Sequence, residues 1–131
     1  MIHIIKSTPT SQQIEEMPEH YSYAKLAVDV RQGVVAGGGE MHADCEAVLL
    51  ENGSRQQDVW GADWRPKQNR ATFESLINIR PAQGNSKMTI EDTVLREKIE
   101  VIVRKVFGNA SSFKSARKIS PRYYASPFGG G

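Results

Sequence analysis

The densest group of side chains that could carry chemistry lies in residues 37–46, where three glycines precede His42, Asp44 and Glu46. If this segment is extended, alternate residues share a face, so the imidazole and the two carboxylates would project together. Such a set could bind zinc, iron or manganese. The alternative is that His42 and Asp44 cap the glycine-rich turn while Glu46 is solvated. We favour this alternative, and we expect no metal and no cofactor.

Cys45 is the only cysteine, so no disulfide can form within the chain. The segment from His42 to Glu46 has the outline of the zinc deaminase signature H-x-E…P-C-x-x-C. Asp44 replaces the required glutamate, however, and one cysteine cannot supply two ligands, so this activity is excluded. Cys45 alternates with small apolar residues, and we interpret it as a packed core thiol that suits a reducing compartment.

The glycines themselves are candidate binding residues. The backbone amides of Gly37, Gly38 and Gly39 could cradle an anion, yet Glu40 follows them where a phosphate loop has a helix and a lysine. We expect a bulge or a sharp bend, or a backbone that another group approaches closely.

Two tryptophans form a second candidate surface. Trp60 and Trp64 flank a turn that contains Asp63, and Asp58 lies just before it. The indoles could form a binding platform rimmed by the two aspartates, or they could close the open end of a small sheet. Asp58 and Asp63 join His42 and Asp44 as candidate catalytic residues.

Charge divides the chain into two parts. Residues 1–109 carry thirteen Lys and Arg against fifteen Asp and Glu, whereas residues 110–131 carry four cations and no acid. We therefore expect a single domain over 1–109, which is unsuited to binding nucleic acid across its own face, and a disordered basic tail over 110–131. The tail interleaves cations with aromatic rings, which suits an acidic protein groove, RNA or anionic lipid. Its candidate contact residues are Lys114, Arg117, Lys118, Arg122, Tyr123 and Tyr124.

The predicted elements must position these residues. The order of elements predicts an α+β fold with a largely antiparallel sheet of five or six strands and two helices on one face. Asn52-Gly53 predicts a tight hairpin between two strands. The expected strands are residues 2–5, 25–30, 34–36, 45–51, 54–60 and 72–79, and the expected helices are residues 10–21 and 89–107, in the order β-α-β-β-β-β-β-α. No apolar run is long enough to span a membrane, and we expect a soluble, cytoplasmic protein.

The sequence resembles a small uncharacterised bacterial protein family that is frequent in cyanobacteria. Four segments carry the resemblance: residues 25–30 (KLAVDV), 36–46 (AGGGEMHADCE), 57–62 (QDVWGA) and 75–81 (SLINIRP). The resemblance covers residues 1–109, stops at the tail and implies no known activity. It does imply that the glycine-rich segment and the Trp60 turn belong together.

Because no catalytic constellation is complete, we expect a non-enzymatic binding or accessory protein. A protein partner would dock on the tail, on the surface formed by residues 37–46 and 60–64, or on both. Nucleic acid or an anionic membrane would bind only through the tail. The alternative is a small metal-dependent or hydrolytic enzyme centred on His42, Asp44 and Glu46.

Overall fold

The computed structural model describes residues 2–6 and 24–107. The helix predicted over residues 10–21 and the tail over 110–131 lie outside the described residues. The strands are β1 (His3–Ile5), β2 (Ala24–Asp29), β3 (Val34–Gly37), β4 (Val59–Arg65) and β5 (Arg70–Thr72), and the helices are α2 (His42–Glu51) and α3 (Thr93–Phe107). No helix in this part of the chain is both long enough and apolar enough to cross a membrane.

The five strands form one antiparallel sheet in the order β1-β3-β2-β4-β5. The predicted α+β class is therefore confirmed. The strands predicted over residues 25–30 and 34–36 are also confirmed, as β2 and β3, and they form a hairpin whose turn contains Gly33 with a φ of 71°. At the turn, both carboxylate oxygens of Asp29 accept hydrogen bonds, from the backbone of Arg31 and Gln32 and from the side chains of Gln32 and Ser54.

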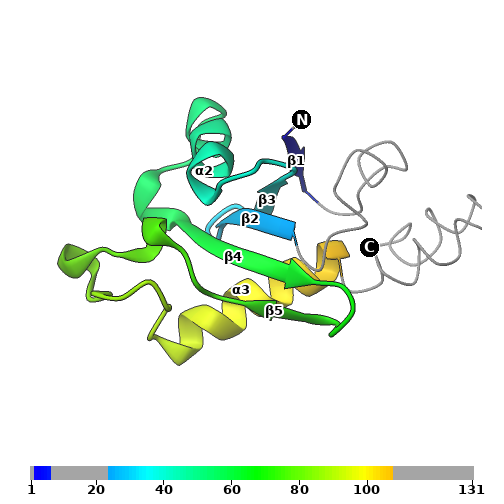
Figure 1. The fold of residues 1–131 in the computed structure, drawn as a ribbon. Coiled ribbons are helices and arrows are strands. Elements are labelled where there is room, and N and C mark those ends of the chain that lie inside the picture. Colours follow the sequence, from blue (N-terminus) through cyan, green and yellow to red (C-terminus); the bar gives the residue numbers. More distant parts are fainter. Residues whose placement is uncertain (1, 7–23, 108–131) are drawn as a thin grey trace, which may run out of the picture.

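The two helices cover opposite faces of the sheet (Figure 1). Leu26 and Val28 of β2 pack in a core with α3, whereas Ala27 between them packs in a second core with Cys45 and Leu49 of α2. This separation follows from the alternation of side chains along a strand. The prediction that both helices lie on one face concerned the helices over residues 10–21 and 89–107, and the first of these lies outside the described residues.

Residues 45–51 form most of α2, and the prediction of a strand there is wrong. Asn52-Gly53 ends this helix instead of forming a hairpin. Ser54 N–H donates to Leu49 O at 3.0 Å, Gly53 N–H donates to Leu50 O at 3.2 Å, and Gly53 has a φ of 98°. This is a Schellman C-terminus, which uses the same Asn-Gly pair as a type I′ hairpin.

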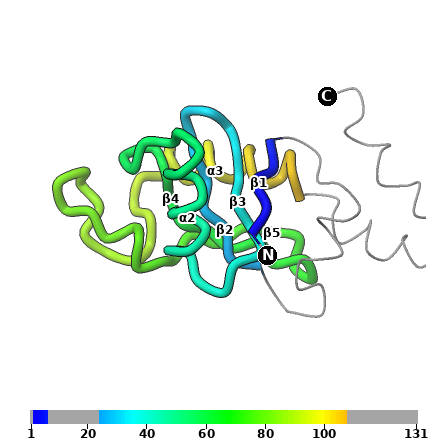
Figure 2. The backbone as a smooth tube through the Cα atoms, turned by 90° about the horizontal axis from the view of Figure 1, so that it is seen from above, coloured from blue at the N-terminus to red at the C-terminus, as the bar shows by residue number. Residues whose placement is uncertain are grey.

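The remaining boundaries shift along the chain. The strand predicted over residues 54–60 begins only at Val59 and continues to Arg65, and the strand predicted over 72–79 is replaced by β5 and a long loop. This loop follows β5 and projects beyond one end of the sheet, as the yellow-green segment of Figure 2 shows. The last helix is confirmed, and Asp92 caps it by accepting from Val94 N–H and Leu95 N–H.

Candidate functional site

The structure brings together two of the four candidate catalytic residues. His42 is the first residue of α2 and Asp63 lies on β4, and His42 Nε2 is 2.8 Å from Asp63 Oδ1. The same nitrogen lies 3.1 Å from the carbonyl oxygen of Ala62. Because both neighbours are acceptors, the proton of the neutral ring must be on Nε2, which leaves Nδ1 as the basic nitrogen. Both side chains are nearly buried, with 13% and 8% of their surface exposed.

Asp63 continues this contact into a short polar chain that ends at the edge of the sheet. Thr72 Oγ1 donates to Asp63 Oδ2 at 3.3 Å, and Arg65 Nε donates to Thr72 Oγ1 at 3.2 Å. Asp63 and Thr72 are directly paired across β4 and β5, and Arg65 is paired with Arg70 on the same face. The pair His42–Asp63 is therefore linked to the side chains of the edge strand.

The other acidic candidates lie elsewhere. On a helix, residues 42 and 46 share a face and residue 44 does not, so Asp44 is exposed while Glu46 contacts Arg80 at 3.3 Å. Asp58 accepts from two exposed arginines, Arg31 and Arg55. Among the described residues, no three His, Cys, Asp or Glu side chains are grouped so that they could hold a metal ion. The expectation that His42, Asp44 and Glu46 share a face is wrong, because the segment is helical.

Arg80 was not singled out from the sequence, yet it is the centre of a buried network. Its side chain is 9% exposed, and its N–H groups donate to the carbonyl oxygens of Ile77, Gln56 and Val59 and to the side chains of Gln83 and Glu46. Burial lowers the pKa of Arg80, and the charge of Glu46 opposes this shift. Burial likewise raises the pKa of Glu46 against the opposing effect of Arg80. The pair ties α2 to the start of β4 and to the long loop.

Trp60 and Trp64 are core residues, with 4% and 1% of their surface exposed. Both pack in the core beneath α3, and the guanidinium of Arg80 lies 4.6 Å from the ring centre of Trp60. A ligand could stack on these indoles only if they left the core. The two rings therefore pack in the core and do not form an exposed binding platform.

The glycine run turns the chain from β3 into α2. Gly37 ends β3, Gly38 has a φ of 103°, and a Cβ at Gly39 would lie 3.1 Å from Cys45 Sγ. The predicted close approach is thus confirmed for Gly39. Cys45 itself is fully buried, as predicted, and burial raises the pKa of its thiol. A buried thiol of this kind is a poor nucleophile.

A polar groove of about 430 Å³ runs along the edge strand β5. It lies where the hydrogen-bonded side chains of Asp63, Thr72 and Arg65 reach the surface. Three of its lining side chains are arginines, from β4, β5 and α3, and two are acidic. The groove is lined by Asp63, Arg65, Gln68, Arg70, Ala71, Thr72, Phe73, Glu74, Thr89 and Arg96.

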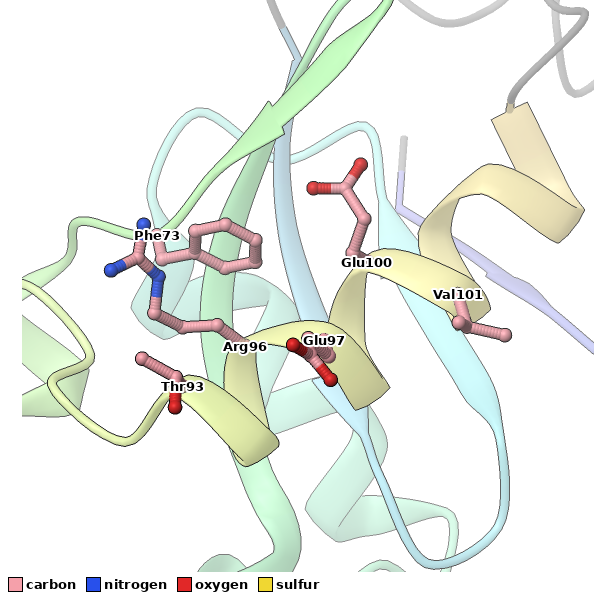
Figure 3. Close-up of a pocket in the computed structure, with 6 residues that line it drawn as sticks. All are labelled: Phe73, Thr93, Arg96, Glu97, Glu100 and Val101. Atoms are coloured by element: carbon pink, nitrogen blue, oxygen red, sulfur yellow. The ribbon is translucent and has the colours of Figure 1, made fainter.

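A second hollow of about 540 Å³ lies beside the groove on the surface of α3. Figure 3 shows Arg96 beside the ring of Phe73, with Glu97, Glu100 and Val101 farther along the helix. The guanidinium carbon of Arg96 is 5.2 Å from the centre of that ring. Phe73 and Arg96 line both hollows, so Arg96 marks the boundary between them.

Two buried asparagines, also not singled out from the sequence, shape the long loop. Asn78 is fully buried, and its side-chain amide donates to Gly61 O and Met88 O and accepts from Gly61 N–H. The amide nitrogen of Asn85 is within hydrogen-bonding distance of three backbone carbonyls of the loop, and its oxygen accepts from Glu91 N–H. The loop is therefore an ordered structure that bounds the groove.

One sequence signal for the groove was available. The turn between β4 and β5 reads Arg65-Pro-Lys67-Gln-Asn-Arg70, which is three cations in six residues with no acid. In a body with a small acidic excess this run indicates a local basic surface. The sequence could not have shown that Arg96 belongs to this basic surface, because Arg96 reaches the groove only through the packing of α3 against the sheet.

Comparison with known families matches residues 3–106 to a family described as "Protein of unknown function (DUF5674)". No curated protein and no solved structure matches the chain. The resemblance to an uncharacterised family without a known activity is therefore confirmed.

Proposed function

The chain belongs to the DUF5674 family, whose function is unknown, and we propose that it is a non-enzymatic binding protein that holds an acidic segment of a partner protein in the groove along β5. The observation that carries the proposal is the placement of Arg65, Arg70 and Arg96 around one polar groove. Arginine suits this role because its planar guanidinium can bind a carboxylate through two parallel hydrogen bonds.

The charge of the groove differs from that of the body. Residues 1–109 have two more acids than bases, so a region with three arginines is a local exception. Arg70 is exposed at the edge of the sheet, and within the described residues no carboxylate lies within ion-pairing distance of it. A partner with several carboxylates would therefore be both attracted and selected by this surface.

The tail would add to the same interaction. Its cations Lys114, Arg117, Lys118 and Arg122 have the same sign as the groove, and Tyr123 and Tyr124 could pack on the partner. One acidic partner could thus engage both regions. Binding through two linked regions raises the overall affinity when the linker can span both sites. RNA or an anionic membrane would, by contrast, need the tail alone. The single buried thiol fits a reducing cytoplasm.

Fluorescence anisotropy with a labelled hexaglutamate peptide tests the proposal. Arg70→Gln and Arg96→Gln should each weaken binding by about five-fold, the change that corresponds to about 1 kcal/mol. Arg55→Gln is the matched control, since Arg55 is an exposed arginine that pairs with Asp58 away from the groove. Binding should also weaken as salt is added. Equal losses in all three variants, or no binding by the unaltered protein, would contradict the proposal.

A second candidate function, the small hydrolytic enzyme, is favoured by the contact between His42 and Asp63. A carboxylate that fixes one ring nitrogen leaves the other as a base, as in catalytic triads. Among the described residues, however, the hydroxyl that is hydrogen-bonded to this pair, that of Thr72, bonds Asp63 and not His42. Hydrolysis of small chromogenic esters that is lost in His42→Ala would favour this enzyme, and no hydrolysis would oppose it.

A further inference from the structure

The outer edge of the sheet is formed by β5 and by residues 73–75 that follow it. Another segment of the chain pairs with residues 73–75 but not with β5. Beyond β5, Glu74 forms an antiparallel bridge with Thr89. Ile90 N–H donates to Phe73 O at 3.0 Å, and Ser75 N–H donates to Met88 O at 3.1 Å. Residues 88–90 therefore occupy the position of a sixth strand beside residues 73–75.

The same position beside β5 itself is open within the described residues. After Ile90 the chain leaves the edge: Glu91 N–H donates to Asn85 Oδ1 at 2.8 Å, and Asp92 caps α3. Had residues 88–90 continued straight, the next three residues would have paired with Arg70–Thr72. The groove lies along this unoccupied stretch, from Arg70 to Thr89.

Resting on the proposed function, we propose that the acidic partner segment binds as an added antiparallel strand along Arg70–Thr72, end to end with residues 88–90. The edge of a sheet presents backbone donors and acceptors that an extended peptide can pair with. Backbone pairing supplies affinity, and the side chains of the groove select the sequence.

The register of the sheet specifies the pattern of the bound segment. Arg70 and Arg65 project from one face, and Ala71 between Arg70 and Thr72 projects from the other. Carboxylates at alternate residues of the segment would therefore reach the arginines of the first face. The intervening side chains would point toward Phe73 and Arg96 on the second face, where an apolar residue can pack on the ring.

The acidic residues of the groove limit where the carboxylates bind. Asp63 and Glu74 lie at the end near Thr72, whereas Arg65 and Arg70 lie at the end near the turn between β4 and β5. A carboxylate opposite Arg70 is attracted, and one beside Glu74 is repelled. The segment should thus carry its acids toward the turn.

The test uses a labelled heptapeptide of alternating glutamate and valine and two N-methylated versions of it with the full-length protein. N-methylation removes a backbone donor without changing the charge. In an added strand only alternate amides face the protein, so one set of methyl groups should weaken binding roughly ten-fold, as expected from the loss of one or two hydrogen bonds. Methyl groups on the other set of amides, which face away from the protein, should leave the affinity unchanged.

The outcomes separate the two proposals. If both methylated peptides bind as well as the parent peptide, acidic recognition stands and strand addition is wrong. Strand addition is also wrong if both sets weaken binding equally, because the effect then follows from the stiffness of the peptide. If the parent peptide does not bind at all, the proposed function fails and the strand inference fails with it.

Discussion

The side-chain amide of Asn78 binds both backbone groups of Gly61, accepting from its N–H at 2.8 Å and donating to its carbonyl oxygen at 3.0 Å. An asparagine side chain thus supplies β4 with the two hydrogen bonds that a neighbouring strand would supply. Gly61 must lack a side chain for this contact, because a Cβ there would lie 2.5 Å from Ser75 Cβ. The loop that bounds the groove is attached to the sheet at this point.

We predict that Asn78→Ala destabilises the protein by about 2–4 kcal/mol, because it leaves the N–H and the carbonyl of Gly61 buried without partners. Urea denaturation followed by circular dichroism measures the change. Asn52→Ala is the control: Asn52 is exposed and its amide donates to one helix carbonyl, so it should cost less than about 1 kcal/mol. Equal effects would show that Asn78 does not attach the loop.

Arg80→Lys should cost about 2–3 kcal/mol even though the charge is kept. A lysine has three donors on one nitrogen and cannot reach the separate acceptors that the guanidinium joins, among them the carbonyls of Val59 and Ile77. Arg55→Lys is the matched change at an exposed arginine that pairs with Asp58, and it should stay within about 0.5 kcal/mol. This account of the network would be contradicted if Arg80→Lys lowered the melting temperature no more than Arg55→Lys does.

The parts of the fold that were predictable are those whose signals are local. The hairpin between β2 and β3 follows from two apolar runs around Gly33, and α3 follows from apolar residues spaced at three and four. The prediction of a strand over residues 45–51 was wrong because the signal that follows it, Asn52-Gly53, is typical of a helix C-terminus as well as of a hairpin. Local chemistry alone does not separate the two.

The site was less predictable, because its contacts join distant positions. His42 meets Asp63 only once α2 is helical and packed across β4, and both conditions depend on tertiary structure. Asn78 had no local signal, since its role depends on the absence of a strand beside Gly61. The basic turn over residues 65–70 was visible in the sequence, but its partner Arg96 was not.

Asp29 should make the free energy of unfolding depend on pH. Burial opposes its ionisation, but hydrogen bonds from Ser54, Gln32 and Arg31 outweigh this and hold the pKa of Asp29 below its usual value. A carboxyl whose pKa is lower in the folded state stabilises fully above its unfolded pKa of about 4 and less as pH falls below it. We predict that Asp29→Asn lowers the free energy of unfolding by about 1–3 kcal/mol at pH 7.

The same substitution should reduce the loss of stability between pH 5 and pH 3, since all other carboxyl groups are unchanged. Denaturant titrations of both proteins at the two pH values measure it. Asp44→Asn, at an exposed residue of α2, should change the stability at pH 7 by less than about 0.5 kcal/mol. Parallel losses in the unaltered protein and in Asp29→Asn would contradict the role given to these hydrogen bonds.

Deleting residues 110–131 should leave the domain folded, because α3 ends at Phe107 and Phe107 is already buried in the core. The melting temperature should fall by no more than a few degrees, which corresponds to about 1 kcal/mol for a domain of this size. A larger fall would show that the tail packs on the body. The shortened protein should still bind an acidic peptide through the groove, though more weakly than the full chain.

The most direct measurement of the central claim is a heteronuclear NMR titration of the full chain with the heptapeptide of alternating glutamate and valine. We predict that the backbone amides that shift most are those of β5, of the turn over residues 65–70 and of Thr89, on both sides of the open edge. The chemical shifts of the amides in the β2–β3 turn, at the opposite end of the sheet, should not change. Shifts confined to the tail, or spread over the surface without a maximum at β5, would contradict the claim that this groove is the binding site.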